Sequence, residues 1–382
     1  MCQFTKWTRM NWFKSVGILF LLLLTFGCND RLSIEGGPAN DITGFFLLNE
    51  GNMSYGRSTL DYYDYASGIY TKRIYQERNP DEEWGLGSVG NDMAIYGSKL
   101  YVVVNCSNMV KVMDVRTLKQ IEAIYVQNCR SITFKDQYAY VSSYDCLAEL
   151  NPEAGPGCVV KIDTTSLTPE DACPVGYQPE EMAIVGDYLY VANSGGYRVP
   201  DYDNTVSVID LNTFREIKKI DVAPNLHRME ADAYGNIWVS SRGDYYDIPS
   251  MTFVISTENQ TVVEQLDQLP CTDMTLCGDS LYVFSNTWND FTQSRDISYA
   301  IVDVKTHEVL TRSFITDSTE TLITNPYGIA VNPITREILI TDARDYITHG
   351  ELYCFSPAGQ MKWSVSTGDI PSRIVFTRTP LQ

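Results

Sequence analysis

The chain has 382 residues, a formal net charge of −19, 25 tyrosines and 25 glycines. A surface this acidic repels phosphate backbones and anionic lipid headgroups, which argues against nucleic-acid binding and against electrostatic docking on a membrane. Beyond the N-terminal region no long stretch shows an apolar period of 3.6 residues, which excludes a helical solenoid.

Residues 1–27 have the pattern of a secretory signal peptide. Basic residues at Lys6, Arg9 and Lys14 precede an apolar run from Val16 to Phe26, and Met10 is an alternative start. This pattern predicts that the leader is removed from the exported protein.

Cys28 follows the small residue Gly27 at the end of the apolar run, as in a bacterial lipobox. We expect Cys28 to be acylated after cleavage, so that the protein is held on a membrane by lipid alone. The alternative is an unmodified thiol within a membrane anchor. Residues 28–42 are then the lipidated cysteine and a flexible polar tether, and residues 43–382 form one domain.

The stretch MAIVGDYLYVAN from Met182 to Asn193 predicts a β-hairpin, because two alternating runs flank a tight Gly-Asp turn. A second hairpin with an Asp-x-x-Thr turn follows it, as in NTVSVIDLNTFREI from Asn204. The first hairpin recurs at Met93–Asn105, Ile132–Ser143, Met229–Ser241, Met274–Ser285 and Ile329–Asp342. A four-stranded unit that returns about every 40 to 50 residues is typical of a β-propeller blade.

The two ends of the domain give the number of blades. FFLLN at Phe45–Asn49 matches the second strand of the unit, and no inner strand precedes it. SRIVFT at Ser372–Thr377 supplies a strand of that kind at the other end of the chain. The sequence therefore predicts an all-β fold, a seven-bladed β-propeller closed by the C-terminal strand, which completes the N-terminal blade and leaves no open sheet edge.

Eight cysteines remain when Cys2 and Cys28 are set aside, an even number that allows disulfides in an exported chain. The sequence does not fix their connectivity, and free buried thiols are the alternative. Pairs that lie close to one strand or loop are Cys271 with Cys277, Cys146 with Cys158, and Cys106 with Cys129. No CxxC pair occurs among them, so the spacing does not indicate a structural zinc site, and we expect no metal.

Candidate ligand contacts follow from blade alignment, because each inner strand begins at the face to which the loop after the second strand returns. The loops on this face are long and rich in aromatic and amide side chains, which favours binding. The alternative is that they only plug the ring. The candidate ligand-binding residues are Trp84, Asp92, Asn105, Arg130, Tyr144, Glu180, Asn193, Tyr197, His227, Arg228, Arg242, Tyr245, Asn286, Trp288, Tyr327, Arg344, Tyr346 and Arg373.

Catalytic signatures are scarce. Only one of the three histidines, His227, falls at the mouth of the predicted channel, and HExxH, GxSxG with a supporting histidine, and P-loop motifs are absent. We therefore expect a protein that is not an enzyme and has no catalytic residues. The alternative is a lactonase- or lyase-like propeller with a channel metal held by Glu180, Asn193 and Asp342.

The LYVAN-type inner hairpins and VSVIDLNT-type outer hairpins resemble the YncE-like seven-bladed propellers. With Cys28, the FFLLNEGN segment from Phe45 and the Tyr- and Asn-rich loops, the chain most resembles the BtuG-like surface lipoproteins of gut Gram-negative anaerobes. That resemblance implies a lipid-anchored protein on the cell surface of the outer membrane. It also implies capture of cobalamin (vitamin B12) as a transported ligand rather than a cofactor, and delivery to a BtuB-like TonB-dependent transporter. A glycan- or peptide-binding lipoprotein of another uptake system is the alternative.

Overall fold

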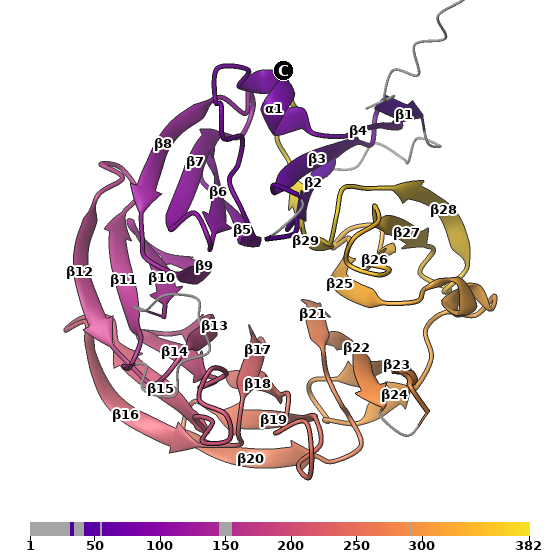
Figure 1. Cartoon of the computed structure of the whole chain (residues 1–382). Helices are drawn as coiled ribbons and strands as arrows, with labels where there is room; N and C mark the ends of the chain where they lie inside the picture. The colour runs from indigo at the N-terminus through magenta and orange to yellow at the C-terminus, as the bar shows by residue number, and fades with distance from the viewer. Residues whose placement is uncertain (1–30, 34–41, 54–55, 145–154, 290–291) are drawn as a thin grey trace, which may run out of the picture.

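The computed structural model describes residues 31–33, 42–53, 56–144, 155–289 and 292–382 (Figure 1). The predicted signal peptide, Cys28 and most of the predicted tether lie outside these ranges. Within them, no helix is long and apolar enough to cross a bilayer.

Seven β-sheets surround a central axis, which confirms the seven-bladed propeller (Figure 1). Blade 1 contains β1 (Arg31–Ser33), β2 (Gly44–Asn49), β3 (Thr59–Asp64), β4 (Ile69–Thr71) and β29 (Pro371–Thr377). Blade 2 contains β5 (Gly90–Tyr96), β6 (Lys99–Val104), β7 (Met109–Asp114) and β8 (Gln120–Tyr125). Blade 3 contains β9 (Cys129–Lys135), β10 (Tyr138–Ser143), β11 (Cys158–Asp163) and β12 (Pro169–Pro174).

The remaining blades repeat this order from the axis outwards. Blade 4 contains β13 (Pro179–Val185), β14 (Tyr188–Asn193), β15 (Thr205–Asp210) and β16 (Arg215–Asp221). Blade 5 contains β17 (Leu226–Ala231), β18 (Asn236–Ser241), β19 (Met251–Ser256) and β20 (Thr261–Leu266). Blade 6 contains β21 (Asp273–Cys277), β22 (Ser280–Asn289), β23 (Ser294–Asp303) and β24 (Val309–Thr311). Blade 7 contains β25 (Pro326–Val331), β26 (Ile338–Asp342), β27 (Glu351–Phe355) and β28 (Met361–Ser366). In the described part of the chain, two short helices, α1 (Ile74–Arg78) and η1 (Thr319–Leu322), lie in connections between blades.

The ring closes as predicted. Strand β29 pairs antiparallel with β2, with Phe46 opposite Val375, so the last strand of the chain is the inner strand of blade 1. Strand β1 was not predicted, because residues 31–33 fall in the segment expected to be a tether. It pairs with β4 through Leu32 opposite Tyr70 and covers an outer strand of only three residues, which shields that edge.

The core lies between neighbouring blades, which pack face to face. The middle strands are buried on both sides, as in β14, and their sequences are therefore apolar almost throughout. Between blades 4 and 5, for example, Tyr190 and Val206 belong to one cluster with Met229 and Phe253. Outer strands such as β20 alternate between exposed and half-buried residues. This pattern explains why the inner hairpins were the clearest repeats in the sequence.

Three carboxylates, one in every second blade, join adjacent inner strands. Asp92 of blade 2 accepts the backbone N–H of Ile132 at 2.9 Å. Glu181 of blade 4 accepts that of Met229 at 2.9 Å, and Asp273 of blade 6 accepts that of Ile329 at 3.2 Å. At the joint between blades 7 and 1 the backbones approach so closely that a Cβ on Gly328 would collide with the carbonyl oxygen of Ser372.

Six of the described cysteines are free thiols: Cys106, Cys129, Cys173, Cys271, Cys277 and Cys354. A Cys271–Cys277 disulfide is ruled out by the extended strand β21 between them, since five residues span roughly 16 Å and a disulfide requires Cα atoms within about 7 Å. Cys146 lies outside the described residues, so a pair with Cys158 stays a prediction.

Candidate ligand-binding face

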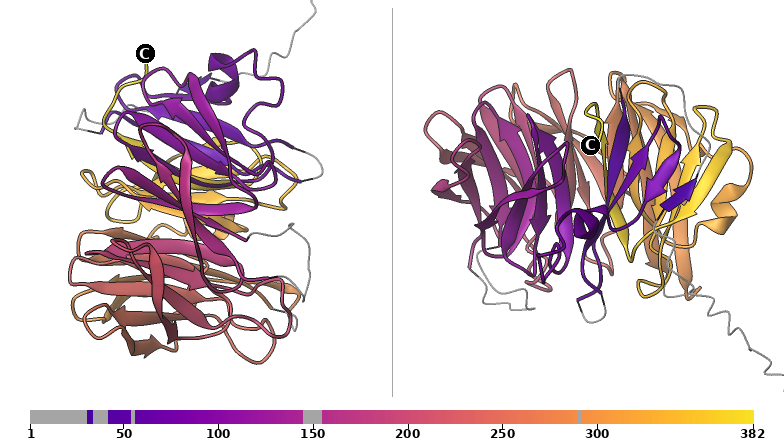
Figure 2. Two further views of the ribbon diagram at one scale, coloured as in Figure 1. Left: turned by 90° about the vertical axis from the view of Figure 1, so that its left-hand side faces the viewer. Right: turned by 90° about the horizontal axis from the view of Figure 1, so that it is seen from above.

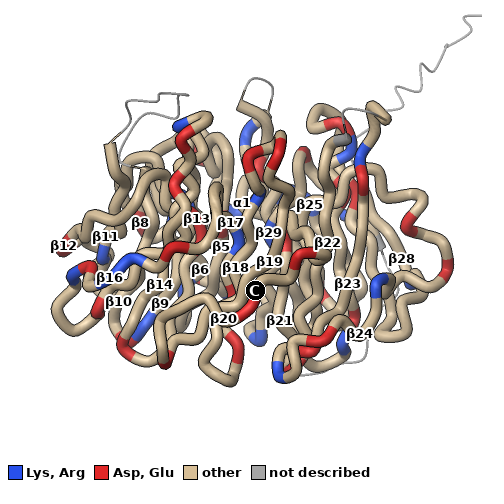
Figure 3. The backbone as a smooth tube through the Cα atoms, turned by 90° about the horizontal axis from the view of Figure 1, so that it is seen from below, with Lys and Arg blue, Asp and Glu red and all other residues tan. Residues whose placement is uncertain are grey.

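Two sets of loops meet on one face of the ring. Each inner strand begins there, and the loops after each second and fourth strand return to it; we call this the loop face (Figures 2 and 3). Its centre is a polar depression at the end of the axial channel, with a volume of about 290 Å³, which we call the channel mouth. Seven predicted residues line it: Arg130, Glu180, His227, Arg228, Arg242, Tyr327 and Arg373.

Glu180 is the centre of a buried ion-pair group in the channel mouth. Nε and Nη2 of Arg130 each lie 3.1 Å from Oε2 of Glu180, and the hydroxyl of Tyr144 donates to Oε1 at 2.5 Å. Arg242 adds a longer ion pair at 3.7 Å. Burial opposes ionisation of Glu180, but the two arginines and the Tyr144 hydrogen bond outweigh it and lower its pKa. Glu180 is therefore a carboxylate whose oxygens are already engaged.

His227 is neutral. Burial, together with the charges of Arg242, Arg228 and Arg130, lowers the pKa of His227 well below its usual 6.5. Its Nε2 lies 2.8 Å from Nη2 of Arg242, which can only donate, so Nε2 accepts and the proton resides on Nδ1. That N–H is buried and has no partner among the described residues, which leaves one directed donor in the wall of the channel mouth.

Two arginines deeper in the channel bind the carboxylates that join the blades. Arg228 contacts Glu181 at 2.7 Å and Asp273 at 2.9 Å. Arg373 pairs with Glu181 and lies 3.4 Å from Asp92. Asp92, Arg228 and Arg373 thus hold the ring together, a structural role that their place in the sequence did not reveal.

Two further carboxyls have pKa values near neutrality, and the sequence analysis missed both as site residues. Burial raises the pKa of Glu50 to about 7, against the hydrogen bond that Tyr327 donates at 3.0 Å. Burial and the charges of Asp273 and Asp92 raise the pKa of Glu230 to about 8. Glu50 follows β2 and Glu230 lies within β17, and nothing in the sequence distinguishes either from a solvated acid.

Aromatic side chains surround the channel mouth. On the side of blades 6 and 7, Arg295 lies over the rings of both Trp288 and Tyr346, at 6.0 and 5.6 Å. Tyr346 stacks edge-on against Tyr327 with centroids 5.9 Å apart. Asn286 accepts from Arg295 at 3.1 Å and donates to Asn325. Trp288 keeps 51% of its surface exposed although it lies in this fixed arrangement.

The opposite side of the rim belongs to blades 3 to 5. Tyr144 and Tyr197 pack edge to face at 5.3 Å, and Arg130 lies 5.0 Å from the ring of Tyr144. Tyr245 packs edge-on against Tyr202 at 6.5 Å and is 62% exposed.

Three predicted residues are engaged in the scaffold. Asn105 is buried and donates to Asn128 and to the carbonyl of Cys129, both at 3.0 Å. Asn193 is buried, donates to Ser207 at 2.9 Å and accepts from the N–H of Gly176. Arg344, in the loop between β26 and β27, binds Glu351 at 3.1 Å. The amides of Asn105 and Asn193 thus bond to the scaffold, whereas the Arg344 side chain remains 45% exposed beside its ion pair.

The metal set considered from sequence is not assembled. The carboxylate of Asp342 accepts the backbone N–H groups of Thr324 and Asn325, and Asn193 is engaged as described. Of the three residues in this set, only Glu180 lines the channel mouth. Across the described ranges, no group of three or more His, Cys, Asp or Glu side chains is arranged to hold an ion.

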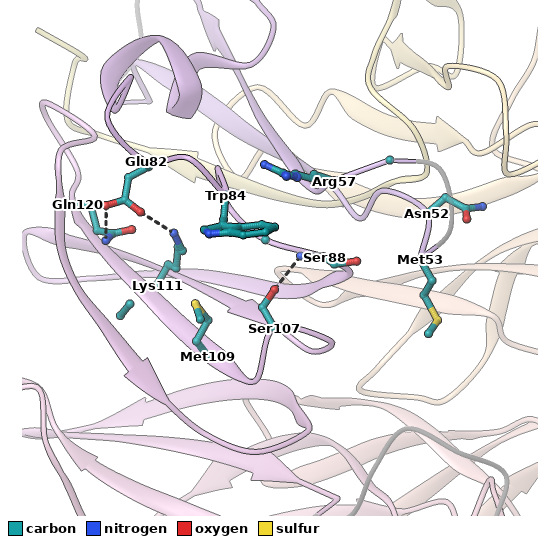
Figure 4. A pocket seen from close by; sticks show the side chains of 13 residues that line it. Asn52, Met53, Arg57, Glu82, Trp84, Ser88, Ser107, Met109, Lys111 and Gln120 are labelled. Carbon is teal, nitrogen blue, oxygen red and sulfur yellow. Dashed lines mark hydrogen bonds and ion pairs between the residues drawn. The ribbon is translucent and has the colours of Figure 1, made fainter.

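Trp84 lies apart from the channel mouth, in a larger cavity between blades 1 and 2 that we call the blade 1–2 cavity (Figure 4). Its volume is about 680 Å³. Among the lining residues are Met53, Arg57, Glu82, Trp84, Met109 and Lys111. Of these, only Trp84 was singled out from sequence, because the others are scattered over two blades and one inter-blade loop.

The two cavities differ in the ligand they can enclose. Small-molecule sites commonly occupy about 300–1,000 Å³. The blade 1–2 cavity falls inside that range, whereas the channel mouth, at about 290 Å³, admits only a small group or one arm of a larger molecule. Fold and site together define a propeller with a rigid, aromatic-rimmed loop face.

Comparison with known proteins gives the family. Residues 43–366 match the family described as a domain of unknown function, DUF5074, and the chain belongs to it. No curated protein matches the sequence.

Solved structures share the fold at low sequence identity. The periplasmic gluconolactonase PpgL of Pseudomonas aeruginosa is 14% identical with a TM-score of 0.59, over 87% of this chain and 99% of that one. A functionally unknown protein from Desulfotomaculum acetoxidans is 11% identical with a TM-score of 0.59, over 88% and 99% of the two chains. A quinonprotein alcohol dehydrogenase-like protein from Bacteroides thetaiotaomicron is 16% identical with a TM-score of 0.57, over 89% and 79%. At such identities the likeness shows the propeller fold alone.

Proposed function

We propose that this protein is a non-enzymatic surface lipoprotein that captures cobalamin on its loop face and passes it to a TonB-dependent outer-membrane transporter of the BtuB type. The observation that carries the proposal is the fixed aromatic and arginine rim around a polar channel mouth. Exposed rings that are already held in place lose little conformational entropy on binding, which is what high affinity requires.

The chemistry of the rim suits a corrinoid. Cobalamin is a broad, amphipathic disc fringed with amide side chains, and it is too large for a depression of about 290 Å³. The disc would lie across the rim, against the rings of Trp288 and Tyr245. An amide oxygen of one side chain can accept the unpartnered Nδ1–H of His227 inside the channel mouth.

The charge state of the mouth supports an uncharged ligand group. The arginines Arg130, Arg228 and Arg373 all pair with buried carboxylates. Near neutral pH, Glu50 in the channel mouth, with a pKa of about 7, is about half protonated, and Glu230 on the inner strand β17, with a pKa of about 8, is mostly protonated. Because the charges are matched in this way, a neutral amide enters without leaving a buried ion unpaired.

The test is isothermal titration of residues 29–382 with cyanocobalamin. We expect one-to-one binding that is weakened at least tenfold by Trp288→Ala or Arg242→Ala, since removal of a central aromatic or arginine anchor typically costs about 2 kcal/mol or more. The matched control is Tyr234→Ala, an exposed tyrosine in the turn between β17 and β18 on the opposite face. Absence of heat at all accessible concentrations would refute cobalamin and direct the search to glycans, which stack on the same kind of aromatic rim.

A further inference from the structure

The blade 1–2 cavity has an exposed tryptophan on a loop that is firmly held. Trp84 is 71% exposed in the connection between α1 and β5. Buried Lys111 anchors this connection, since its ammonium donates to the carbonyl of Gly85 at 2.7 Å and pairs with Glu82 at 3.2 Å. The ammonium of Lys111 donates its third hydrogen bond to the hydroxyl of Tyr75, 3.2 Å away. A large apolar ring is thus kept in water by a polar cluster behind it.

One face of the Trp84 ring is already occupied. The guanidinium of Arg57 lies 4.9 Å from the ring centroid, and its Nη1 donates to the carbonyl of Glu83 at 2.6 Å. Figure 4 shows the indole nearly edge-on, with Arg57 above it and Ser107 and Met109 below it in that view. A cation over one face and thioether groups in the same cavity favour a flat, polarisable partner over a bulky aliphatic one.

The edge of the cavity offers hydrogen bonds with direction. Glu82 is partly exposed and binds Gln120 through Oε1 at 3.2 Å and Lys111 through Oε2, which leaves lone pairs to accept a ring N–H. The hydroxyl of Ser107 accepts the backbone N–H of Ser88 at 2.9 Å and can donate its own proton to a ring nitrogen. One donor and one acceptor at the edge of a stacking surface are complementary to a nitrogen heterocycle.

We propose that the blade 1–2 cavity is a binding site for a planar bicyclic nitrogen heterocycle, separate from the channel mouth, with Trp84 as its stacking platform. The site stands whichever ligand the channel mouth takes. Cobalamin carries a benzimidazole base with this chemistry, and the assignment of the cavity to that base rests on the proposed function above.

The probe is benzimidazole, titrated into residues 29–382 by calorimetry. We expect saturable binding that Trp84→Ala weakens about five- to 150-fold, the range for loss of one aromatic side chain that stacks on a base. Tyr234→Ala is the matched control, because it removes an exposed aromatic ring that also lies near a cation, Lys305 at 6.0 Å, but belongs to the opposite face, and it should leave benzimidazole binding unchanged. Cyclohexanol, apolar but not planar, should not compete.

Several results would overturn the proposal: no benzimidazole binding, equal binding by the wild type and Trp84→Ala, or full competition by cyclohexanol. Thermal melting of Trp84→Ala should match the wild type, since the ring is exposed, so lost binding cannot be assigned to unfolding. A parallel titration separates the two proposals. If the protein binds cyanocobalamin but not benzimidazole, the proposed function stands and the blade 1–2 cavity is not a heterocycle site. If it binds benzimidazole but not cyanocobalamin, the cavity site stands and the proposed function is wrong. Cobinamide, which lacks the base, should be insensitive to Trp84→Ala.

Discussion

Glu181→Gln tests whether the carboxylates of alternate blades hold the ring together. Glu181 pairs with Arg228 at 2.7 Å and with Arg373, and it accepts the N–H of Met229 in the next blade. Glutamine keeps the shape and one acceptor oxygen but removes the charge, so Arg228 and Arg373 each lose one carboxylate partner and keep only Asp273 and Asp92. Breaking a buried pair on one side typically costs about 3–5 kcal/mol when the other charge is left uncompensated, so this range is the upper limit for Glu181→Gln.

The size of the expected Tm shift follows from the size of the propeller. Unfolding entropy is about 2.1 cal/mol/K per residue, or about 0.7 kcal/mol/K for roughly 340 residues, so a loss of about 3–5 kcal/mol would lower Tm by about 4–7 °C, the upper limit of the shift. Scanning calorimetry at one pH and scan rate measures it. The control is Glu258→Gln in the exposed turn between β19 and β20, which should shift Tm by less than about 1 °C. Equal shifts for the two variants would refute the structural role of the carboxylate.

The remaining predictions concern proton binding, ring closure and the thiols. Burial raises the pKa of Glu50 from 4.5 to about 7, so the folded state holds this proton more tightly than the unfolded state, and its contribution to stability falls as pH rises from about 4.5 to 7. Glu50→Gln should therefore gain Tm relative to the wild type between pH 5 and pH 8, and a constant difference would contradict this assignment. Deletion of residues 371–382 removes β29 and should abolish the folded monomer in size-exclusion chromatography, whereas deletion of 379–382 should not; a monomeric folded product of the longer deletion would show that the ring tolerates an open blade. Apart from Cys158, the described cysteines are free thiols, so a drop in Tm of several degrees on adding a reducing agent would reveal a Cys146–Cys158 disulfide, and an unchanged Tm would show that no disulfide stabilises the fold.

The fold could be predicted from sequence because the propeller is repetitive and each inner hairpin is buried on both sides. Middle strands such as β14 are apolar over almost their whole length, and their tight turns need residues like Gly186, which has a φ of 58°. That signal recurs in blades 2 to 7, whereas the inner pair of blade 1 comes from the two ends of the domain. Strand β1 has no such signal, since it covers an edge with three residues and needs no apolar face.

The channel mouth was predicted for the same reason: strand starts in a propeller converge on the axis. Blade alignment could not predict whether a given side chain faces a ligand or bonds to the scaffold. Asn105 and Asn193 occupy aligned strand ends next to the loop face, yet their amides bond to the blades themselves. The blade 1–2 cavity was missed, apart from Trp84, because its walls come from segments that no repeat relates to one another.

The contacts that join neighbouring inner strands alternate around the ring. Carboxylates stand in blades 2, 4 and 6, each reaching forward to the next inner strand, and basic partners lie in blades 1 and 5. An odd number of units cannot alternate all the way round, so two neighbours without a carboxylate must meet somewhere, and they meet at blades 7 and 1. At that joint the chain has Gly328, and close approach of the two backbones takes the place of a carboxylate contact. An even number of blades would let the alternation close completely, so a joint of the Gly328 type, made by backbone proximity, is expected only where the number of blades is odd.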